Sequence, residues 1–533
     1  MEHNKIFPAV RFGDEAGQTV RDCVLELLKA FGMTNIFGNP GSTELPMFRA
    51  FPEPFRYILG LQESVVVGMA DGYAQATGNA ALVNLHSAAG VGHALGNIFT
   101  AYKNQTPLVI TAGQQARSIL PYEPFLFAKD AALFPKPYVK WSCEPARAAD
   151  VPAAIARAYY LAMQPPRGPV FVSIPVDDWD QPCAPLAPRR VSREVRGDPV
   201  MLAEIGEELA KAKNPAFVVG PQVARDEAWG EMLALAEMHR AAIWVSPMSS
   251  RCSFPEDHPL FAGFLAADRE QIVKSLAGHD LILVCGAPVF TYHVEGYGPH
   301  VPVGAAIFQL IDDPDMAAWA PVGSAVVTGL KSALADLLAG PAPRVRMTPP
   351  PRRAPPDLPP MLTDKLLLSR IAKLRPAESI IVEEAPSSRS AMHDYLPILR
   401  PNGFYTCASG GLGHGLPAAV GMALGRPDGK VIALLGDGSS MYSIQGLWTA
   451  AQLGLPIAFI IIRNGRYEAL HEFGRHFGLQ KTVGTALPDL DFCALARGQG
   501  CDAIAVNRID QLDDALRAAF VASVPTLVEV EVV

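Results

Sequence analysis

The chain has 533 residues, of which 49% are hydrophobic and 18% charged, and its formal net charge is -8. This composition excludes a disordered chain, and the length exceeds the ~250–300 residues of a single core, so several domains are expected. The net negative charge argues against nucleic acid and, more weakly, against an anionic membrane surface as a partner.

The cysteines and the N-terminal sequence indicate in which cellular compartment the protein is expected. The eight cysteines are scattered, with no CxxC pair and no spacing typical of zinc ligands, which predicts reduced thiols. Residues 1–15 are mixed and charged, unlike a signal peptide, and no apolar run reaches the ~18 residues of a membrane span. We therefore expect a cytoplasmic protein with no membrane and no nucleic-acid partner.

Two stretches rich in proline and arginine divide the chain. Proline lacks a backbone N–H and fixes φ, so such stretches favour surface linkers over helices or central strands. The predicted organisation is an N-terminal tail (1–18), a first domain (19–182), a linker (183–199), a central domain (200–340), a second linker (341–360) and a third domain (361–533).

Within each domain, apolar strands alternate with amphipathic helices. Such alternation predicts the α/β class, with three domains that are each a mostly parallel sheet flanked by helices. Ligands then bind beyond the carboxyl ends of the strands. The first and third domains could be two copies of one fold. In chain order, the clearest predicted strands are 35–38, 56–59, 81–85, 108–111, 170–174, 216–219, 242–245, 281–284, 379–382, 431–435, 457–462 and 526–532.

Polar side chains follow three of these strands. Ser42 ends the turn after the first strand, His86 follows strand 81–85, and His293 lies just past strand 281–284. Each has an ordinary structural interpretation, as a turn residue or a structural histidine. Three such groups at three strand ends nevertheless favour a shared site, and histidine suits proton transfer near neutral pH.

The most informative motif lies in the third domain. An apolar strand ends in Gly436-Asp437-Gly438-Ser439, and the next apolar strand ends at Asn464, with one helix and one strand expected in between. Asp437 and Asn464 would then lie at neighbouring strand ends and could bind Mg²⁺, while the glycines let backbone N–H groups approach phosphates. The spacing is that of the thiamine diphosphate motif.

Glu63 stands between strand 56–59 and a predicted helix over 65–74. One interpretation is a helix-start acid favoured by the helix dipole. The other is a carboxylic acid that hydrogen-bonds the aminopyrimidine ring of thiamine diphosphate and helps to activate the cofactor. The sequence leaves both open.

With these residues in view, the chain resembles thiamine diphosphate-dependent 2-oxo acid decarboxylases, and among them the benzoylformate decarboxylases. The resemblance spans nearly the whole chain after the tail. It rests on the runs 38–42, 55–59 with Glu63, 70–76, 84–90, 111–115, 177–180, 286–293, 410–413, 436–439 and 447–452.

The resemblance implies a pyrimidine-binding, a central and a pyrophosphate-binding domain, in the pyruvate decarboxylase-like thiamine diphosphate fold. It implies a homo-oligomer, at least a dimer and expected to be a tetramer, with cofactor held between two subunits. Glu63, Ser42, His86 and His293 would be catalytic, with Ser42 at the substrate carboxylate and the histidines moving protons. The cofactor-binding set would be Glu63, Ser387, Gly410, Leu412, Asp437, Gly438, Ser439 and Asn464, and the metal ligands would be Asp437, Asn464 and the Arg466 carbonyl.

The substrate pocket departs from the pattern of the family. It would comprise Phe125, Leu126, Thr406, Leu470 and Phe473, with Thr406 in place of a phenylalanine and Phe125 in place of a leucine. Arg463, Arg466 and Glu468 also differ from the close relatives, and Glu468 would disfavour an anionic substrate if it pointed inward. The preferred acyl group is therefore open.

The implied activity is that of a carboxy-lyase that converts an aryl 2-oxo acid such as benzoylformate to an aldehyde and CO2 with thiamine diphosphate and Mg²⁺, as in mandelate-type aromatic catabolism. The alternative is a carboligase or acetolactate synthase-like enzyme that makes 2-hydroxy ketones or acetohydroxy acids. A catalytically silent cofactor-binding subunit conflicts with the presence of Glu63. A nicotinamide oxidoreductase is the weakest option because no dinucleotide fingerprint is present.

Overall fold

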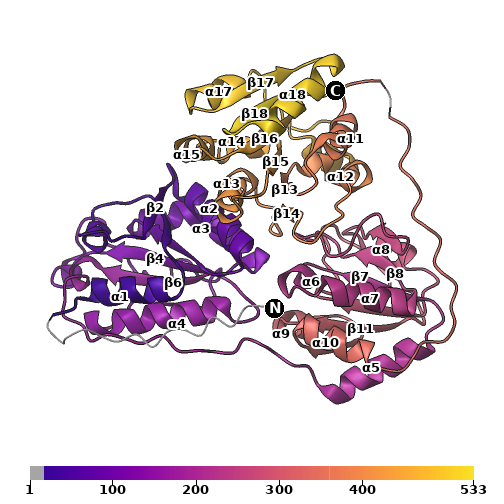
Figure 1. Cartoon of the computed structure of the whole chain (residues 1–533), viewed down its shortest axis with the longest axis horizontal. Helices are drawn as coiled ribbons and strands as arrows, with labels where there is room; N and C mark the ends of the chain where they lie inside the picture. The colour runs from indigo at the N-terminus through magenta and orange to yellow at the C-terminus, as the bar shows by residue number, and fades with distance from the viewer. Residues whose placement is uncertain (1–16, 359) are drawn as a thin grey trace.

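The computed structural model describes residues 17–358 and 360–533, so the predicted N-terminal tail lies outside the described residues except for Gly17 and Gln18. The described chain forms three six-stranded sheets flanked by helices, and all paired strands within them run parallel. Figure 1 shows the three units around a central junction. The predicted α/β class is confirmed, and the sheets are parallel throughout.

The first unit has the strand order β2-β1-β3-β4-β6-β5. Its core strands are continuously apolar and fully buried, which is the pattern of a parallel sheet covered on both faces. The strands are β1 (Asn35–Gly38), β2 (Arg56–Leu59), β3 (Ala81–Leu85), β4 (Leu108–Gln114), β5 (Ser142–Cys143) and β6 (Val170–Pro175), and the helices are α1 (Val20–Ala30), α2 (Glu63–Thr77), α3 (Ser87–Asn104) and α4 (Val151–Met163).

The central unit has the order β12-β11-β10-β7-β8-β9. The strands are β7 (Pro215–Val219), β8 (Ala242–Val245), β9 (Phe261–Phe264), β10 (Leu281–Cys285), β11 (Ala306–Ile311) and β12 (Ser324–Val327). The helices are α5 (Pro199–Lys211), α6 (Gln222–Arg225), α7 (Trp229–His239), α8 (Arg269–Ser275), α9 (Pro314–Ala318) and α10 (Leu330–Leu338).

The third unit has the order β14-β13-β15-β16-β18-β17. The strands are β13 (Ile380–Glu384), β14 (Phe404–Thr406), β15 (Val431–Gly436), β16 (Ile457–Arg463), β17 (Asp502–Val506) and β18 (Thr526–Glu531). The helices are α11 (Asp364–Leu374), α12 (Arg389–Tyr395), α13 (Gly415–Gly425), α14 (Asp437–Met441), α15 (Gly446–Gln452), α16 (Glu468–His476), α17 (Phe492–Gly498) and α18 (Ile509–Val521). Two helices, α14 and α15, therefore precede β16 where the sequence predicted one, because the Gly-Asp-Gly turn itself winds into a short helix.

The first and third sheets have the same topology. If strands are numbered from one within each unit, both sheets have the order 2-1-3-4-6-5, whereas the central sheet has the order 3-2-1-4-5-6. In such sheets the chain reverses its direction of winding between two neighbouring strands, and ligands bind at the carboxyl ends there. These switch points lie between β1 and β3 in the first unit, and between β13 and β15 in the third.

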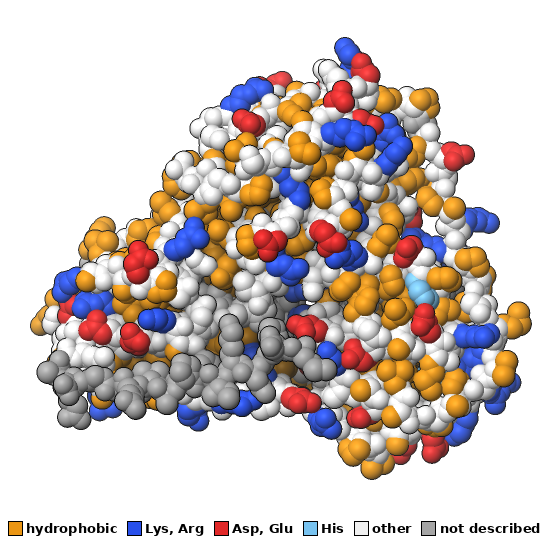
Figure 2. Space-filling view, in the orientation of Figure 1, with side chains coloured by type: hydrophobic (Ala, Val, Ile, Leu, Met, Phe, Trp, Pro, Cys, Tyr) orange, Lys and Arg blue, Asp and Glu red, His pale blue; other side chains and the backbone are white. Residues whose placement is uncertain are grey.

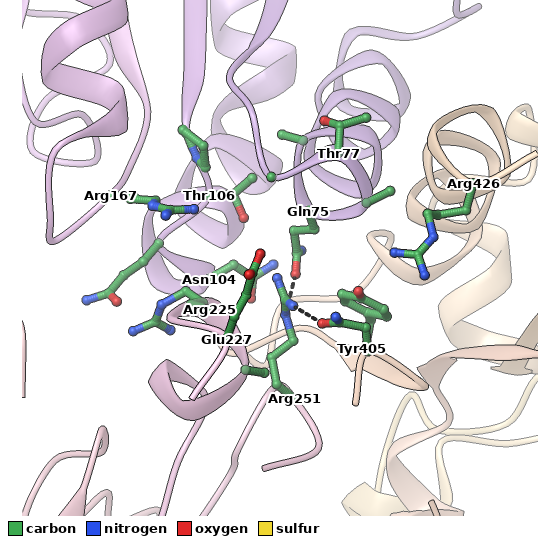
Figure 3. Close-up of a pocket in the computed structure, with 17 residues that line it drawn as sticks. Gln75, Thr77, Asn104, Thr106, Arg167, Arg225, Glu227, Arg251, Tyr405 and Arg426 are labelled. Atoms are coloured by element: carbon green, nitrogen blue, oxygen red, sulfur yellow. Dashed lines mark hydrogen bonds between the residues drawn. The ribbon is translucent and has the colours of Figure 1, made fainter. Parts of the chain in front are cut away.

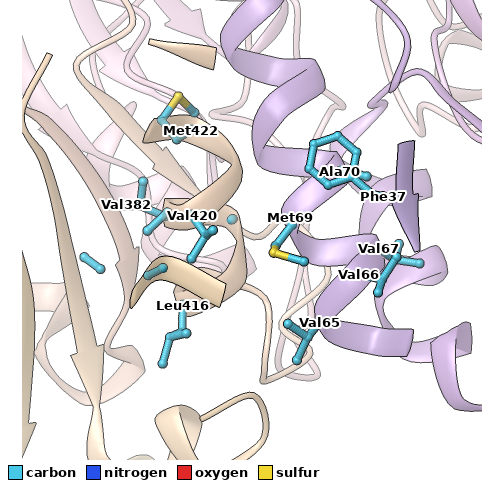
Figure 4. Packing of buried hydrophobic residues seen from close by; sticks show 14 of the residues in the cluster. Phe37, Val65, Val66, Val67, Met69, Ala70, Val382, Leu416, Val420 and Met422 are labelled. Carbon is cyan, nitrogen blue, oxygen red and sulfur yellow. The ribbon is translucent and has the colours of Figure 1, made fainter. Parts of the chain in front are cut away.

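Helices α2 and α13 join the first and third units through one shared hydrophobic core. Figure 4 shows Met69 of α2 facing Leu416 and Val420 of α13. The helices approach so closely that a Cβ added to Gly421 would lie 1.8 Å from the carbonyl oxygen of Met69. A Cβ added to Gly72 would lie 2.0 Å from the carbonyl oxygen of Ala418. Glycine is therefore required on both helices.

The two proline-rich stretches have almost no regular structure over 183–198 and 341–358, and the second runs along the outer edge of the molecule in Figure 1. Arg346 fixes this second stretch to the central unit by donating hydrogen bonds to the carbonyl oxygens of Ala212 and His239.

Acidic and basic side chains are interspersed over the face seen in Figure 2. Among the helices of the described residues, none is long and apolar enough to cross a membrane.

Candidate active site

His86 lies at the switch point of the first sheet, directly after β3. Its Nδ1 is 2.9 Å from Oε2 of Glu44 and 3.1 Å from Oγ1 of Thr43. Glu44 is buried and also accepts hydrogen bonds from the backbone N–H groups of Gly41 and Gly113. A carboxylate fixed in this way orients the imidazole and leaves Nε2 for another partner.

Ser42 lies in the turn after β1, beside this histidine. A Cβ added to Gly41 would lie 2.2 Å from Nδ1 of His86, so the imidazole packs directly on the turn. The Ser42 side chain is exposed. The structure therefore brings Ser42 and His86 to one edge, as the sequence predicted from two separate strand ends.

Glu63 is the first residue of α2 and is nearly buried, with 9% of its surface exposed. Its carboxylate accepts a hydrogen bond from Nδ2 of Asn39 at 3.3 Å and lies 3.2 Å from Nδ1 of His93. Gly90, four residues after His86, also faces the Glu63 side chain. The side chain of Gln62 caps the start of α2. The Glu63 carboxylate is therefore not needed as a cap and contacts these polar groups instead.

Asp437 and Asn464 meet at the ends of the adjacent strands β15 and β16. The Asp437 carboxylate is buried. It accepts hydrogen bonds from the backbone N–H groups of Gly438 at 2.7 Å, Asn464 at 3.1 Å and Gly465 at 2.7 Å. Burial raises the pKa of Asp437 despite these hydrogen bonds. Within the described residues this carboxylate has no ion pair, so a cation here would compensate its charge.

The donor set fits a magnesium ion. A carboxylate oxygen from Asp437 and an amide oxygen from Asn464 are the hard ligands that Mg²⁺ prefers. Oδ1 of Asn464 accepts one hydrogen bond, from the backbone N–H of Arg466 at 3.1 Å, and a carbonyl oxygen has a second lone pair. A Cβ added to Gly438 would lie 2.2 Å from the ring of Tyr467, so packing in this turn also requires a glycine.

Ser387 and Ser439 lie in turns that follow neighbouring strands, β13 and β15. Ser387 belongs to a short 3-10 helix, Pro386–Ser388. The Ser439 hydroxyl donates to the carbonyl oxygens of Glu384 and Gly436, so its backbone N–H at the start of α14 is the group left to face an anion. This edge therefore brings oxygen ligands of the kind that bind a cation close to backbone N–H groups of the kind that bind an anion.

The turn that contains Gly410 and Leu412 is anchored by Glu384 at the end of β13. The Glu384 carboxylate accepts hydrogen bonds from the backbone N–H groups of Gly413 at 2.6 Å, His414 at 2.7 Å and Gly415. Burial raises the pKa of Glu384. Gly410 has a φ of +71°, a conformation that favours glycine.

The charged residues that depart from the family pattern are paired with one another. Nε of Arg466 is 2.5 Å from Oε2 of Glu468, and Arg463 contacts Glu529 and Glu531, both at 2.8 Å. Glu468 therefore has its charge compensated by Arg466, and Arg463 is paired with two carboxylates at the end of β18.

His293 and Phe473 form a third group. The imidazole of His293 packs edge-on against Phe473 with 4.8 Å between ring centroids. Phe473 and Leu470 both belong to α16, which begins four residues after Asn464. His293 from the central unit is thus adjacent to the helix that follows the candidate metal site.

The remaining predicted pocket residues lie elsewhere. Phe125 is 87% exposed, and its neighbour Leu126 accepts a hydrogen bond from Oγ of Ser87, so this loop lies beside the His86 turn. Thr406 is buried in β14, where its hydroxyl accepts a hydrogen bond from Arg389 at 2.8 Å.

The predicted site residues thus form two separate half-sites. One comprises Ser42, Glu63 and His86 in the first unit, and the other comprises Asp437, Asn464, His293 and Phe473. Among the described residues, no hydrogen bond, ion pair or ring contact joins the members of one half-site to those of the other.

Sequence reasoning missed Glu44, His93 and Glu384, which hold or contact the predicted residues. Glu44 and His93 had a local signal, because each is close in sequence to a predicted site residue, Ser42 or His86. Glu384 had none, since the backbone N–H group of Gly413 that it binds lies 29 residues later in the chain.

Comparison with known proteins adds an independent finding. Family models described as the N-terminal TPP binding domain, the central domain and the C-terminal TPP binding domain of thiamine pyrophosphate enzymes match residues 18–129, 202–337 and 386–530. Benzoylformate decarboxylase from Pseudomonas aeruginosa is 45% identical over 520 residues, which cover 96% of this chain and 98% of that protein.

Two solved structures have the same fold over nearly the whole chain. Benzoylformate decarboxylase from Polynucleobacter necessarius superposes with a TM-score of 0.95 at 39% identity, covering 97% of this chain and 98% of that one. A thiamine diphosphate-dependent 4-hydroxybenzoylformate decarboxylase from Rhodococcus jostii superposes with a TM-score of 0.94 at 42% identity, covering 97% of this chain and 99% of that one.

Proposed function

This chain belongs to the thiamine diphosphate-dependent enzymes, and from that premise we propose that it decarboxylates an aryl 2-oxo acid of the benzoylformate type to an aldehyde and CO2. The main observation in support is the presence of two imidazoles in defined settings, His86 held by Glu44 and His293 against Phe473. Two placed proton carriers suit protonation of the product carbon and release of an aldehyde.

The residues that would hold the cofactor are those of the β13, β15 and β16 strand ends. Asp437, Asn464 and the carbonyl of Arg466 would bind Mg²⁺, and the turns at Ser387 and Ser439 would hold the diphosphate. Leu412 and the Gly410 carbonyl would contact the ring system. When bound, thiamine diphosphate supplies a nucleophilic carbon and an electron sink for the departing carboxylate.

The protein groups then have separate tasks. Glu63, shielded from water and steadied by Asn39, would hold a proton at the aminopyrimidine ring. Ser42 would donate a hydrogen bond to the substrate carboxylate, and the turn at Gly41 keeps it beside His86. His86 and His293 would deliver protons after CO2 leaves, and Phe473 and Leu470 would give the substrate ring an apolar surface that excludes water.

A substrate screen tests the proposal. Purified protein with thiamine diphosphate and Mg²⁺ is assayed for aldehyde release from benzoylformate, ring-substituted benzoylformates, pyruvate and longer alkyl 2-oxo acids. We expect kcat/KM for an aryl substrate to exceed that for pyruvate by at least about tenfold, because the alkyl acid lacks the ring that Phe473 and Leu470 would bind.

Product analysis distinguishes the alternatives. A 2-hydroxy ketone or acetohydroxy acid as the main product would identify a carboligase and overturn the proposal. The absence of any turnover in a protein that binds the cofactor would indicate a silent subunit.

We also propose that the enzyme is a homo-oligomer in which the Glu63 half-site of one subunit faces the Asp437 half-site of another. The separation of the two half-sites within the chain supports this arrangement, as does the exposure of Phe125 beside the His86 turn.

A further inference from the structure

A cavity lined by four arginines lies where the three units meet, away from both half-sites. Arg167 follows α4 of the first unit, Arg225 and Arg251 belong to the central unit, and Arg426 follows α13 of the third. Figure 3 shows Arg251 in the middle, with Arg167 and Arg225 on one side and Arg426 on the other. We call this the arginine cavity, and its volume is about 170 Å³.

The positive charge of the arginine cavity is poorly balanced. Glu227 is the one acidic residue among the described residues that line it. Asp312 lies outside the lining, 3.8 Å from Arg225. Asp71 also lies outside the lining and is paired with His414 at 3.2 Å. Among the described residues, four guanidinium groups therefore face the cavity against one carboxylate of its lining, while Asp312 and Asp226 act on Arg225 and Arg167 from outside the lining.

Arg251 is the most constrained of the four, with 9% of its surface exposed. Nε donates to Oε1 of Gln75 at 3.0 Å, Nη1 donates to Oδ1 of Asn402 at 3.4 Å, and the guanidinium stacks 4.4 Å from the ring centre of Tyr405. These partners are neutral, and a guanidinium has more N–H donors than two acceptors satisfy.

Arg167 has no hydrogen bond or ion pair from its side chain within residues 17–358 and 360–533. Burial lowers the pKa of Arg167, and the neighbouring guanidinium groups of Arg193 and Arg225 lower it further, against an opposing effect of the Asp226 carboxylate. Burying cations together without a counter-charge destabilises a fold, and an anion in their midst removes that penalty.

We propose that the arginine cavity binds a compact, multiply charged oxyanion of the phosphate type and that this anion clamps the three units together. The planar guanidinium suits bidentate pairing with phosphate oxygens. Gln75, Asn104 and Thr106 of the lining are fixed by hydrogen bonds to Asp71, so the cavity wall is polar and suits an inorganic anion better than an aryl carboxylate.

The proposed site is separate from the cofactor-binding residues, because its lining includes none of Ser387, Asp437 or Asn464. The experiment therefore uses holoenzyme saturated with thiamine diphosphate and Mg²⁺, which prevents phosphate from occupying the diphosphate-binding turns. Inorganic phosphate is titrated at constant ionic strength set with sodium chloride, and binding is followed by calorimetry and by the unfolding midpoint temperature.

We expect saturable phosphate binding with a rise in the midpoint temperature, since a ligand that binds only the folded state stabilises it. Arg167→Gln and Arg225→Gln should each weaken binding by at least about tenfold, because each removes a charge-assisted contact. Glu227→Gln should tighten binding severalfold, and Arg517→Gln, which alters an exposed arginine on α18, should leave it unchanged.

Three results would overturn the proposal. These are equal responses to phosphate and chloride, loss of the response when the cofactor is saturating, and wild-type affinity in both Arg167→Gln and Arg225→Gln. Arg426→Gln alters an exposed side chain, so it serves as the decisive variant if Arg225→Gln does not fold.

Discussion

At the scale of single residues, the carboxylates of the site have fixed hydrogen-bond partners and therefore distinct tasks. Glu44 is bound by two backbone N–H groups and Thr43, which leaves it to orient His86. Glu384 accepts hydrogen bonds from three backbone N–H groups and so positions a turn. Glu63 is contacted by side chains alone, those of Asn39 and His93.

Glu63→Gln and Asp437→Asn each change one half-site, and we expect each to lower decarboxylation by at least about 100-fold, as loss of an acid–base group or a metal ligand does. If the half-sites of different subunits face each other, a mixture of the two inactive variants regains activity. Random exchange in equal amounts gives intact pairs at about a quarter of the sites. The measurement is the rate after the variants are unfolded and refolded together.

The control for this mixture is a pair of variants in the same half-site, Asp437→Asn with Asn464→Ala, which should show no recovery. No recovery in the Glu63→Gln and Asp437→Asn mixture, despite proven subunit exchange, would place both half-sites of a working centre in one subunit.

At the scale of helices and strands, glycines set the distance between α2 and α13. Gly421→Ala would place a methyl group against the backbone of Met69, which a side-chain movement cannot relieve, so we expect a destabilisation of about 3 kcal/mol or more. Gly96→Ala in α3 is the matched control, because a Cβ there has nothing within 4 Å and should stabilise the helix by about 0.5–1 kcal/mol. Unfolding midpoints of the two variants measure the contrast.

A midpoint for Gly421→Ala at or above that of the wild type would show that the two helices can separate without cost. That result would remove the basis for treating the first and third units as one core.

The sequence predicted the central strands because they are long apolar runs, and it missed short edge strands such as β5, β12 and β17. The burial of β12 and β17 is irregular, so no apolar period marks them. The same reasoning predicted that Ser42, His86 and Asp437 lie at strand ends, since the strand ends of parallel sheets gather at one edge, and the structure places them there. It could not locate Glu384 or the arginine cavity, because these depend on segments that only tertiary folding brings together.

At the scale of the whole molecule, a buried ion pair connects the first and third units. Nε2 of His414 is 3.2 Å from Oδ2 of Asp71, and the two side chains are 2% and 0% exposed. Burial opposes both charges, but the partner outweighs it, so the pKa of His414 lies above its ordinary 6.5 and the pKa of Asp71 below its ordinary 3.8. Asp71 also accepts hydrogen bonds from Thr106 and Asn104.

These shifts predict how the stability of the junction depends on pH. The raised pKa of His414 contributes stability that is complete below 6.5 and is lost as pH rises through the folded-state value. The lowered pKa of Asp71 contributes stability that is complete above 3.8 and is lost as pH falls. The pair therefore stabilises the fold most between these two values.

His414→Gln leaves Asp71 buried without its cation, and we expect it to cost about 3–5 kcal/mol near pH 6. The difference from wild type should shrink as pH rises from 6 through the folded-state pKa of His414, because the wild-type imidazole then loses its proton as well. Unfolding midpoints across this range at one scan rate measure the trend, and His476→Gln, which alters an exposed histidine, should show no such dependence. A difference that is constant with pH would mean that His414 acts through packing alone, and that its charge does not hold the two units together.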